Sequence, residues 1–112
     1  VVVVELMASS CPFCREMVFV LKEVWNKYKE QIFLVSIGIN PYDTDADLKN
    51  WAIQSGADWT CARDTANIGC LFKVTSIPTL VIIDKNRCVK FSHVGLVSTY
   101  ALSQEIDQLI KK

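Results

Sequence analysis

The strongest constraint on the fold is a pattern of two apolar runs separated by an amphipathic segment. Residues 1–7 are apolar except at Glu5, and residues 32–39 form a similar run. Short runs rich in β-branched side chains predict strands that are buried on both faces. Residues 13–29, between them, repeat apolar side chains at helical spacing. A strand, a helix and a strand in this order predict a parallel pair with a right-handed crossover, and therefore an α/β fold.

The rest of the chain predicts an insert of helices, then a hairpin and a last helix. A turn at 84–87 separates two apolar runs, which is typical of antiparallel strands. The expected elements are, in order, a helix capped within 43–45 and ended by Gly56, a short extended piece at 59–62, a helix capped by Asp64 or Thr65, strands at 80–83 and 88–94, and a helix capped by Ser98 or Thr99. We therefore expect one domain over 1–112 with a four-stranded mixed sheet flanked by helices.

Composition argues for one globular domain and against several other classes. The chain has 112 residues, 51% of them hydrophobic, which is enough for one core. Twelve basic residues balance twelve acidic ones without a basic stripe, so nucleic acid is not an expected partner. No apolar run approaches the ~18 residues of a membrane span. The sequence starts within four valines, so we interpret it as a mature or trimmed form whose signal or anchor could be lost, and the compartment stays open.

The cysteines point to chemistry rather than to a disulfide scaffold. They are Cys11, Cys14, Cys61, Cys70 and Cys88, an odd number that cannot all pair within one chain. Cys11 and Cys14 bracket Pro12 and Phe13 where a buried strand meets a helix. A thiolate at a helix N-terminus faces free N–H groups, which lower its pKa below the usual ~8.5 and raise its reactivity. Cys14, one turn further on, can attack a mixed disulfide formed by Cys11.

A zinc site is the alternative for these cysteines. Four ligands are available in Cys11, Cys14, Cys61 and Cys70. The second pair is too widely spaced for a zinc knuckle, and Pro12 begins a helix, so we expect no metal.

The motifs resemble those of a known family. The segment from Val4 to Met17, with Cys-Pro-Phe-Cys inside it, resembles the active-site segment of TlpA-like thiol–disulfide oxidoreductases of the thioredoxin superfamily. The likeness continues through 48–52 and 76–84 and ends at 93–95. It implies a thioredoxin-like fold with a helical insert, Pro41 to Val74, before the strand that follows Pro78. It also implies a monomer without a cofactor, whose Cys11–Cys14 pair exchanges disulfides with protein thiols and with an upstream redox partner.

The same resemblance assigns roles to further residues. Pro78 matches a cis proline that faces the two cysteines. Because proline has no N–H, the backbone of Ile77 is free to pair with an extended substrate beside Cys11. Pro12 and Phe13, between the cysteines, are expected to contact the substrate and to help set the redox potential, which leaves the direction of exchange open. For Pro78, the alternative is an ordinary proline at the start of a strand.

Glu5 is a carboxylate in a run of buried residues. Burial raises the pKa of a carboxyl group, which suits a proton acceptor for the Cys14 thiol. Its position, six residues before Cys11, matches the buried acid of thioredoxins. The alternative is a short strand that leaves Glu5 hydrated or ion-paired.

Two positions depart from the family pattern, and four further cysteine and histidine positions lie outside the Cys11–Cys14 motif. Ser10 and Met7 stand where the family has aromatic residues, so the surface around Cys11 should be more polar. Cys61 and Cys70 are either a second disulfide or two buried thiols. Cys88 is expected to be an ordinary strand residue, and His93 is assigned no role.

Two other functions are alternatives for the whole chain. A peroxidase of the peroxiredoxin type needs proline and threonine ahead of its cysteine, which Ser9 and Ser10 do not supply. A non-catalytic interaction module with a thioredoxin fold would be favoured if the cysteine pair were missing. Disulfide exchange is therefore the predicted function.

Overall fold

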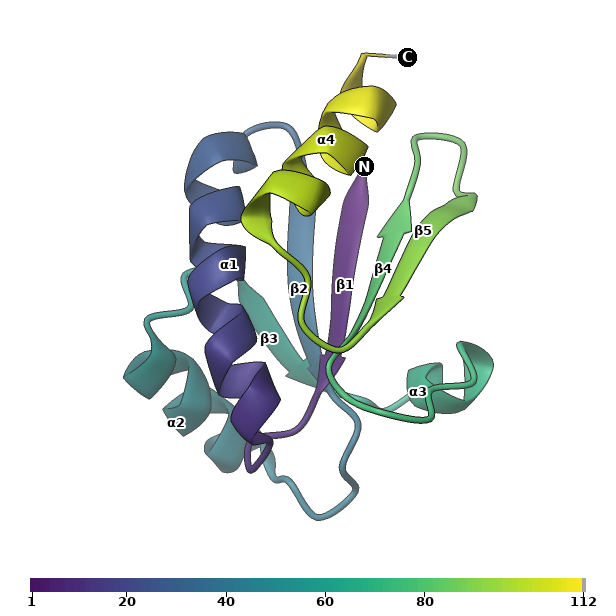
Figure 1. The fold of residues 1–112 in the computed structure, drawn as a ribbon. Helices are drawn as coiled ribbons and strands as arrows, with labels where there is room; N and C mark the ends of the chain where they lie inside the picture. The colour runs from purple at the N-terminus through teal and green to yellow at the C-terminus, as the bar shows by residue number, and fades with distance from the viewer. Residues whose placement is uncertain (112) are drawn as a thin grey trace.

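A computed structural model describes residues 1–111 and shows a mixed five-stranded sheet with helices on both faces (Figure 1). Its strands are β1 (Val2–Met7), β2 (Phe33–Gly38), β3 (Thr60–Arg63), β4 (Thr79–Ile83) and β5 (Val89–Val94). The spatial order is β3-β2-β1-β4-β5, which places β1 at the centre. β1 runs parallel to β2 and antiparallel to β4. The predicted α/β class with a mixed sheet is confirmed.

The number of strands differs from the predicted four. The short extended piece expected at 59–62 is a strand of the sheet, β3, shifted by one residue to 60–63; it pairs with β2 in parallel, from Val35 with Thr60 to Gly38 with Arg63. The strand is short and mostly exposed, because it lies at the edge of the sheet. It therefore lacks the apolar run that identified the other strands.

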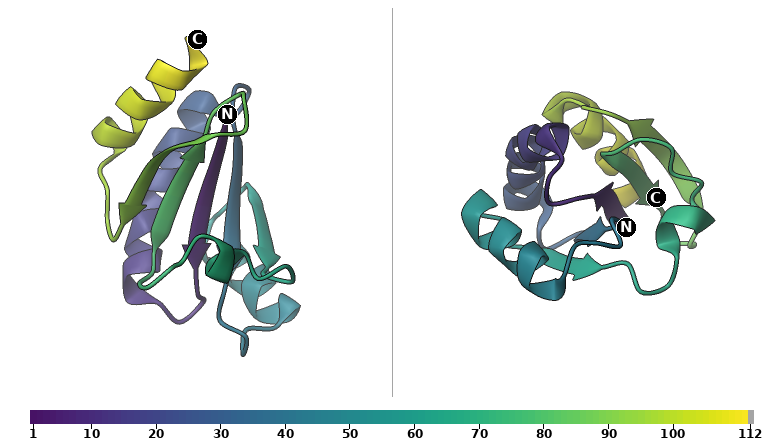
Figure 2. Two further views of the ribbon diagram at one scale, coloured as in Figure 1. Left: turned by 90° about the vertical axis from the view of Figure 1, so that its right-hand side faces the viewer. Right: turned by 90° about the horizontal axis from the view of Figure 1, so that it is seen from below.

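Four helices complete the fold. They are α1 (Pro12–Tyr28), α2 (Asp45–Ser55), α3 (Ile68–Leu71) and α4 (Thr99–Ile110). α1, α2 and α4 cover one face of the sheet, and α3 lies against the other (Figure 2). α3 is a single turn, shorter than predicted, since Asn67 and Lys73 on either side of it adopt left-handed φ values of 54°. Non-glycine residues rarely adopt this conformation within a helix.

The sheet separates two groups of buried side chains. We call the first side the helix-covered face; here Val3, Met7, Leu34 and Leu80 pack under α1, α2 and α4. We call the other side the α3 face, where Val4, Leu6, Val35 and Val81 pack against the segment that includes α3. Alternation along β1 sends Glu5 to the helix-covered face, with Val3 and Met7. Within residues 1–111, no helix is long and apolar enough to cross a membrane.

Candidate active site

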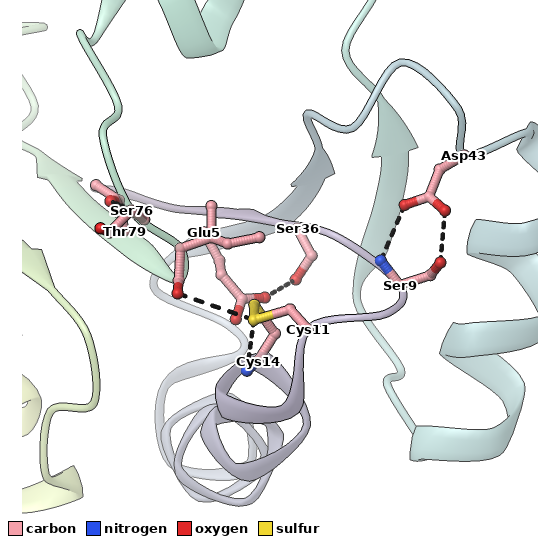
Figure 3. Close-up of a disulfide and its surroundings, with 9 residues drawn as sticks. Glu5, Ser9, Cys11, Cys14, Ser36, Asp43, Ser76 and Thr79 are labelled. Atoms are coloured by element: carbon pink, nitrogen blue, oxygen red, sulfur yellow. Dashed lines mark hydrogen bonds between the residues drawn. A yellow bond between two sulfur atoms is a disulfide. The ribbon is translucent and has the colours of Figure 1, made fainter.

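The first turn of α1 carries the reactive cysteines. Cys11 is the N-cap of the helix, and its Sγ accepts a hydrogen bond from the Cys14 backbone N–H at 3.1 Å. Pro12 occupies the first helical turn, where a missing N–H costs nothing. Cys11 and Cys14 form a disulfide, with their Cα atoms 5.2 Å apart (Figure 3). Both cysteines are thus held at the positive end of the helix dipole.

The two sulfurs have different surroundings. Cys14 is fully buried in the core under α1, whereas Cys11 lies at the wall of a groove of about 580 Å³. Pro12, Phe13 and Ile77 contribute to the same groove. An incoming sulfur atom can therefore approach Cys11 through the groove, while Cys14 is reached only from Cys11.

The segment before β4 forms the opposite wall of the groove. The Ile77–Pro78 peptide bond is cis, as the resemblance implied. The Ile77 carbonyl oxygen lies 3.8 Å from Cys11 Sγ. Pro78 is buried, and its carbonyl oxygen accepts a hydrogen bond from the Gly95 N–H at 2.8 Å. Ile77 therefore lines the groove with its backbone beside the Cys11 sulfur, whereas Pro78, predicted to contact the substrate, is not among the lining residues.

Glu5 is fully buried on the helix-covered face. Figure 3 shows its carboxylate pointing from β1 toward the cysteines at the start of α1. Burial raises the pKa of Glu5 from 4.5 to about 7, although a hydrogen bond from Ser36 lowers it in part. The structure thus removes the alternative of a hydrated Glu5, and it gives the carboxyl group a pKa near neutrality.

Ser36 and Trp59 are linked to Glu5 by consecutive hydrogen bonds, and neither was identified as a candidate from the sequence. Ser36 Oγ donates a hydrogen bond to Glu5 Oε1 at 2.7 Å, and Trp59 Nε1 donates to Ser36 Oγ at 2.9 Å. Ser36 faces Glu5 because β1 and β2 pair in register at these two residues. A serine among apolar strand residues, at the position opposite a buried acid, is the pattern that identifies such a partner.

A second carboxylate fixes the loop that carries Cys11. Asp43 accepts hydrogen bonds from the backbone N–H of Ser9 at 2.9 Å and from its hydroxyl at 2.5 Å (Figure 3). Asp43 was one of three candidate caps for the second helix, but Thr44 and Asp47 form that capping box. The pair joins segments 34 residues apart, which local patterns do not reveal.

The comparisons with known proteins agree with this geometry. The model of the AhpC/TSA family matches residues 1–92. The chain belongs to the AhpC/TSA family. A solved structure assigned as the thiol:disulfide interchange protein DsbE from Chlorobium tepidum is 27% identical, with a TM-score of 0.86, over 97% of this chain and 79% of that one. A thioredoxin-like protein from Aeropyrum pernix is 25% identical, with a TM-score of 0.84, over 96% and 76% of the two chains. No curated protein matches the sequence.

The family and the redox pair together define the activity class. The chain is a thioredoxin-like thiol–disulfide oxidoreductase with a Cys11–Cys14 pair. The predicted membership of the thioredoxin superfamily is confirmed. A further structure, the thioredoxin-like superfamily protein SPOA0173, shares the fold with a TM-score of 0.89 at 19% identity, over 99% of this chain and 80% of that one.

The structure does not bring Cys61 and Cys70 together, and both are free thiols. Cys61 lies on β3 and packs against the helix-covered face, whereas Cys70 lies in α3 on the other side of the sheet. Burial and the nearby Glu5 carboxylate raise the pKa of Cys61 to about 11, with a hydrogen bond to Ser36 opposing them. Cys61 is therefore protonated and unreactive near neutral pH.

Of the remaining candidates, only Ser10 reaches the groove. Cys88 is exposed, one residue before β5. His93 Nε2 lies 2.7 Å from Glu105 Oε1 and so joins β5 to α4. Ser10 is exposed and lines the groove, while Met7 is buried. Among residues 1–111 no three histidine, cysteine or acidic side chains gather as a metal site would require.

Proposed function

We propose that Cys11 and Cys14 exchange disulfides with an extended segment of a protein substrate bound in the groove beside Ile77. The observation that carries this proposal is the unequal placement of the two sulfurs, with Cys11 at the groove and Cys14 sealed beneath it. A substrate strand can pair with the Ile77 backbone, while Pro12 and Phe13 contact it from the other side. The chain acts as a monomeric single domain, with an upstream redox partner that resets the pair.

The first step is an attack by the nucleophile. In the reduced protein, the Cys11 thiolate attacks one sulfur of a substrate disulfide. The bond between the two substrate sulfurs breaks, one of them leaves as a thiolate, and a mixed disulfide with Cys11 forms. The N-terminus of α1 stabilises the thiolate form of Cys11 before the attack.

The second step resolves the mixed disulfide. Cys14 transfers its thiol proton to Glu5 and attacks the sulfur of Cys11, so that the substrate leaves as its second thiolate. Two electrons pass to the substrate, and the protein ends as the Cys11–Cys14 disulfide seen in the structure. Glu5 suits this step because its pKa of about 7 allows it to accept a proton near neutral pH. The reverse sequence oxidises a substrate dithiol.

Trapping tests the assignment. With insulin as the disulfide substrate, Cys14→Ser should accumulate a mixed disulfide through Cys11, visible on non-reducing gels and located by mass spectrometry. Cys11→Ser should trap none, and equal trapping by both variants would contradict the assigned roles. A redox titration against glutathione gives the direction: a potential near ~−270 mV indicates a reductant, and one near ~−120 mV an oxidant.

A further inference from the structure

We propose that Ser36 and Trp59 are positioning residues that orient the Glu5 carboxylate and determine which of its oxygens accepts the Cys14 proton. This inference rests on the proposed function, because it specifies the geometry of the proton transfer assigned to Glu5. It adds Ser36 of β2 and Trp59, the residue before β3, to a site otherwise built from β1, α1 and the segment before β4.

Trp59, Ser36 and Glu5 form a hydrogen-bond chain, and its hydrogen bonds can run in one direction only. An indole N–H is a donor and never an acceptor, so Trp59 Nε1 donates to Ser36 Oγ, at 2.9 Å. The single hydroxyl hydrogen of Ser36 is then free to point at Glu5 Oε1, 2.7 Å away. All three side chains are buried, so water does not compete for these bonds. Trp59 thereby holds the serine hydroxyl in the orientation that donates to Glu5.

This hydrogen-bond chain gives the two carboxyl oxygens of Glu5 different hydrogen-bond partners. Oε1 accepts from Ser36, whereas Oε2 is buried without a hydrogen-bond partner among residues 1–111. Such an oxygen is the better proton acceptor, because protonation there breaks no existing bond. A protonated Oε2 also leaves Oε1 able to accept from Ser36. The hydrogen-bond chain therefore accommodates both the charged and the protonated Glu5 carboxyl group without rearrangement.

Cys14 and Cys61 are the titratable groups near Glu5, and only Cys14 belongs to the redox pair. From β4 the facing residue is Leu80, and from β2 it is Ser36, neither of which titrates. Figure 3 shows the Glu5 carboxylate directed toward the cysteines of α1, and β3 contributes Cys61, whose thiol is protonated near neutral pH. The hydrogen bond from Ser36 also opposes the effect of burial on the pKa of Glu5.

Trp59 is itself held in place. It is buried, and its ring packs edge-on against Trp25 of α1, with the ring centroids 6.5 Å apart. Register along β3 places Cys61 beside Ser36, so that Trp59 precedes the strand at a position from which its indole reaches the serine. The pairing of β3 with β2, which the sequence did not predict, thus positions Trp59 at the far end of the hydrogen-bond chain from Glu5.

The kinetic test measures how fast Cys14 resolves a preformed mixed disulfide, as a function of pH. The wild-type rate should rise with a midpoint near 7, where Glu5 loses its proton. Ser36→Ala removes the donor, so the midpoint should move up by roughly one pH unit and the rate at neutral pH should fall roughly fivefold. Ser36→Thr keeps the hydroxyl and should restore the wild-type midpoint. Trp59→Phe should move the midpoint in the same direction by less, while the matched control Trp51→Phe, at a buried indole whose N–H has no partner within residues 1–111, should leave it unchanged.

Glu5→Gln separates this inference from the proposed function. If Glu5→Gln resolves the mixed disulfide at the wild-type rate and pH dependence, Glu5 is not the proton acceptor and the proposed function loses that step. If Glu5→Gln is slow but Ser36→Ala keeps the wild-type midpoint, only the positioning role is overturned. In the Glu5→Gln background, Ser36→Ala should change nothing further.

A spectroscopic measurement on the unmodified protein removes any dependence on how the variants fold. The indole N–H resonance of Trp59 should shift with pH at the same midpoint as the Glu5 carboxyl carbon, since Ser36 couples the two groups. The Trp51 resonance serves as an internal control, because its indole N–H has no partner within residues 1–111. A Trp59 resonance that does not follow the Glu5 titration would overturn the proposal.

Discussion

The helix-covered face and the α3 face of the sheet are formed by the same strands but differ in what covers them. The first lies under three helices of 17, 11 and 12 residues. The second carries a helix of only four residues. Leu71 of α3 and Val94 of β5 are consequently 71% and 62% exposed. Both the Cys11–Cys14 disulfide and the Glu5 carboxylate lie on the helix-covered face, which is the more deeply buried of the two.

The two regions shift carboxyl pKa values in opposite directions. Glu5, under the helices, loses its hydration, and its pKa rises to about 7. Asp64 precedes α3; burial also acts to raise its pKa, but hydrogen bonds from the backbone N–H groups of Gly69, Ile68 and Ala66 outweigh it and lower the pKa. The comparison shows that depth of cover, together with the donors available, determines whether a carboxylate in this fold becomes a proton acceptor or a fixed anion.

The largest difference should appear when one cysteine from each region is replaced. Cys11→Ser should lower disulfide exchange with insulin by roughly three orders of magnitude or more, because no other thiol at the groove can start the reaction. Cys70→Ser should leave the rate unchanged, since Cys70 is exposed on α3. Comparable losses in the two variants would place an exchange step at α3.

Truncating one leucine in each region should show the difference in packing. Leu21 of α1 is fully buried, so Leu21→Ala should destabilise the protein by about 2–5 kcal/mol through lost burial and a cavity. Leu71→Ala should change the free energy of unfolding by less than about 0.5 kcal/mol. Denaturant unfolding of both variants measures the difference, and equal losses would show that α3 packs as tightly as α1.

Glu5 should make stability depend on pH with a predictable sign. Its pKa is raised in the folded state, so its contribution is fully present below 4.5, falls as the pH rises, and is gone above about 7. Glu5→Gln lacks this decline. Relative to wild type, the variant should therefore gain on the order of 3 kcal/mol between about pH 4 and about pH 8. Unfolding measured across this range tests the expectation, and a pH-independent difference would show that Glu5 does not titrate there.

Asp64 should show the opposite dependence with a smaller amplitude. Because its folded-state pKa is lowered, its contribution is present above its ordinary pKa of 3.8 and is lost as the pH falls through the folded value. Asp64→Asn should destabilise the protein by about 1 kcal/mol near neutral pH, as loss of a capping carboxylate does. The deficit should shrink in acid, and a deficit that is the same at both pH values would assign it to packing instead.

The features that the sequence revealed are those with a local signature. Periodic apolar side chains located α1, β1 and β2, and the cysteine spacing located the redox pair. The position of Glu5 in an apolar run predicted its burial and the direction of its pKa shift, both of which the structure confirms.

The features that the sequence did not reveal depend on pairings between distant segments. β3 is an edge strand with few apolar residues, and only its register with β2 makes it part of the sheet. Ser36 is an unremarkable serine until β2 lies beside β1. Asp43 is a plausible helix cap by local rules, but its carboxylate binds Ser9 instead. Local propensity does not encode such contacts, because they follow from the packing of the whole chain.

The smallest effect concerns Cys61 and Cys70. Because they lie on opposite sides of the sheet, we expect no disulfide between them and no change in stability when Cys70 is replaced. A disulfide needs Cα atoms within about 7 Å, and the sheet lies between these two cysteines. Thiol titration of the oxidised, denatured protein should therefore find three free thiols, those of Cys61, Cys70 and Cys88. Cys70→Ser should not change the melting temperature, and neither should a mild reductant in the Cys11→Ser background. A single free thiol, together with a loss of the roughly 2–3 kcal/mol that a bridge of this loop length contributes, would show that the segment around α3 rearranges to meet β3.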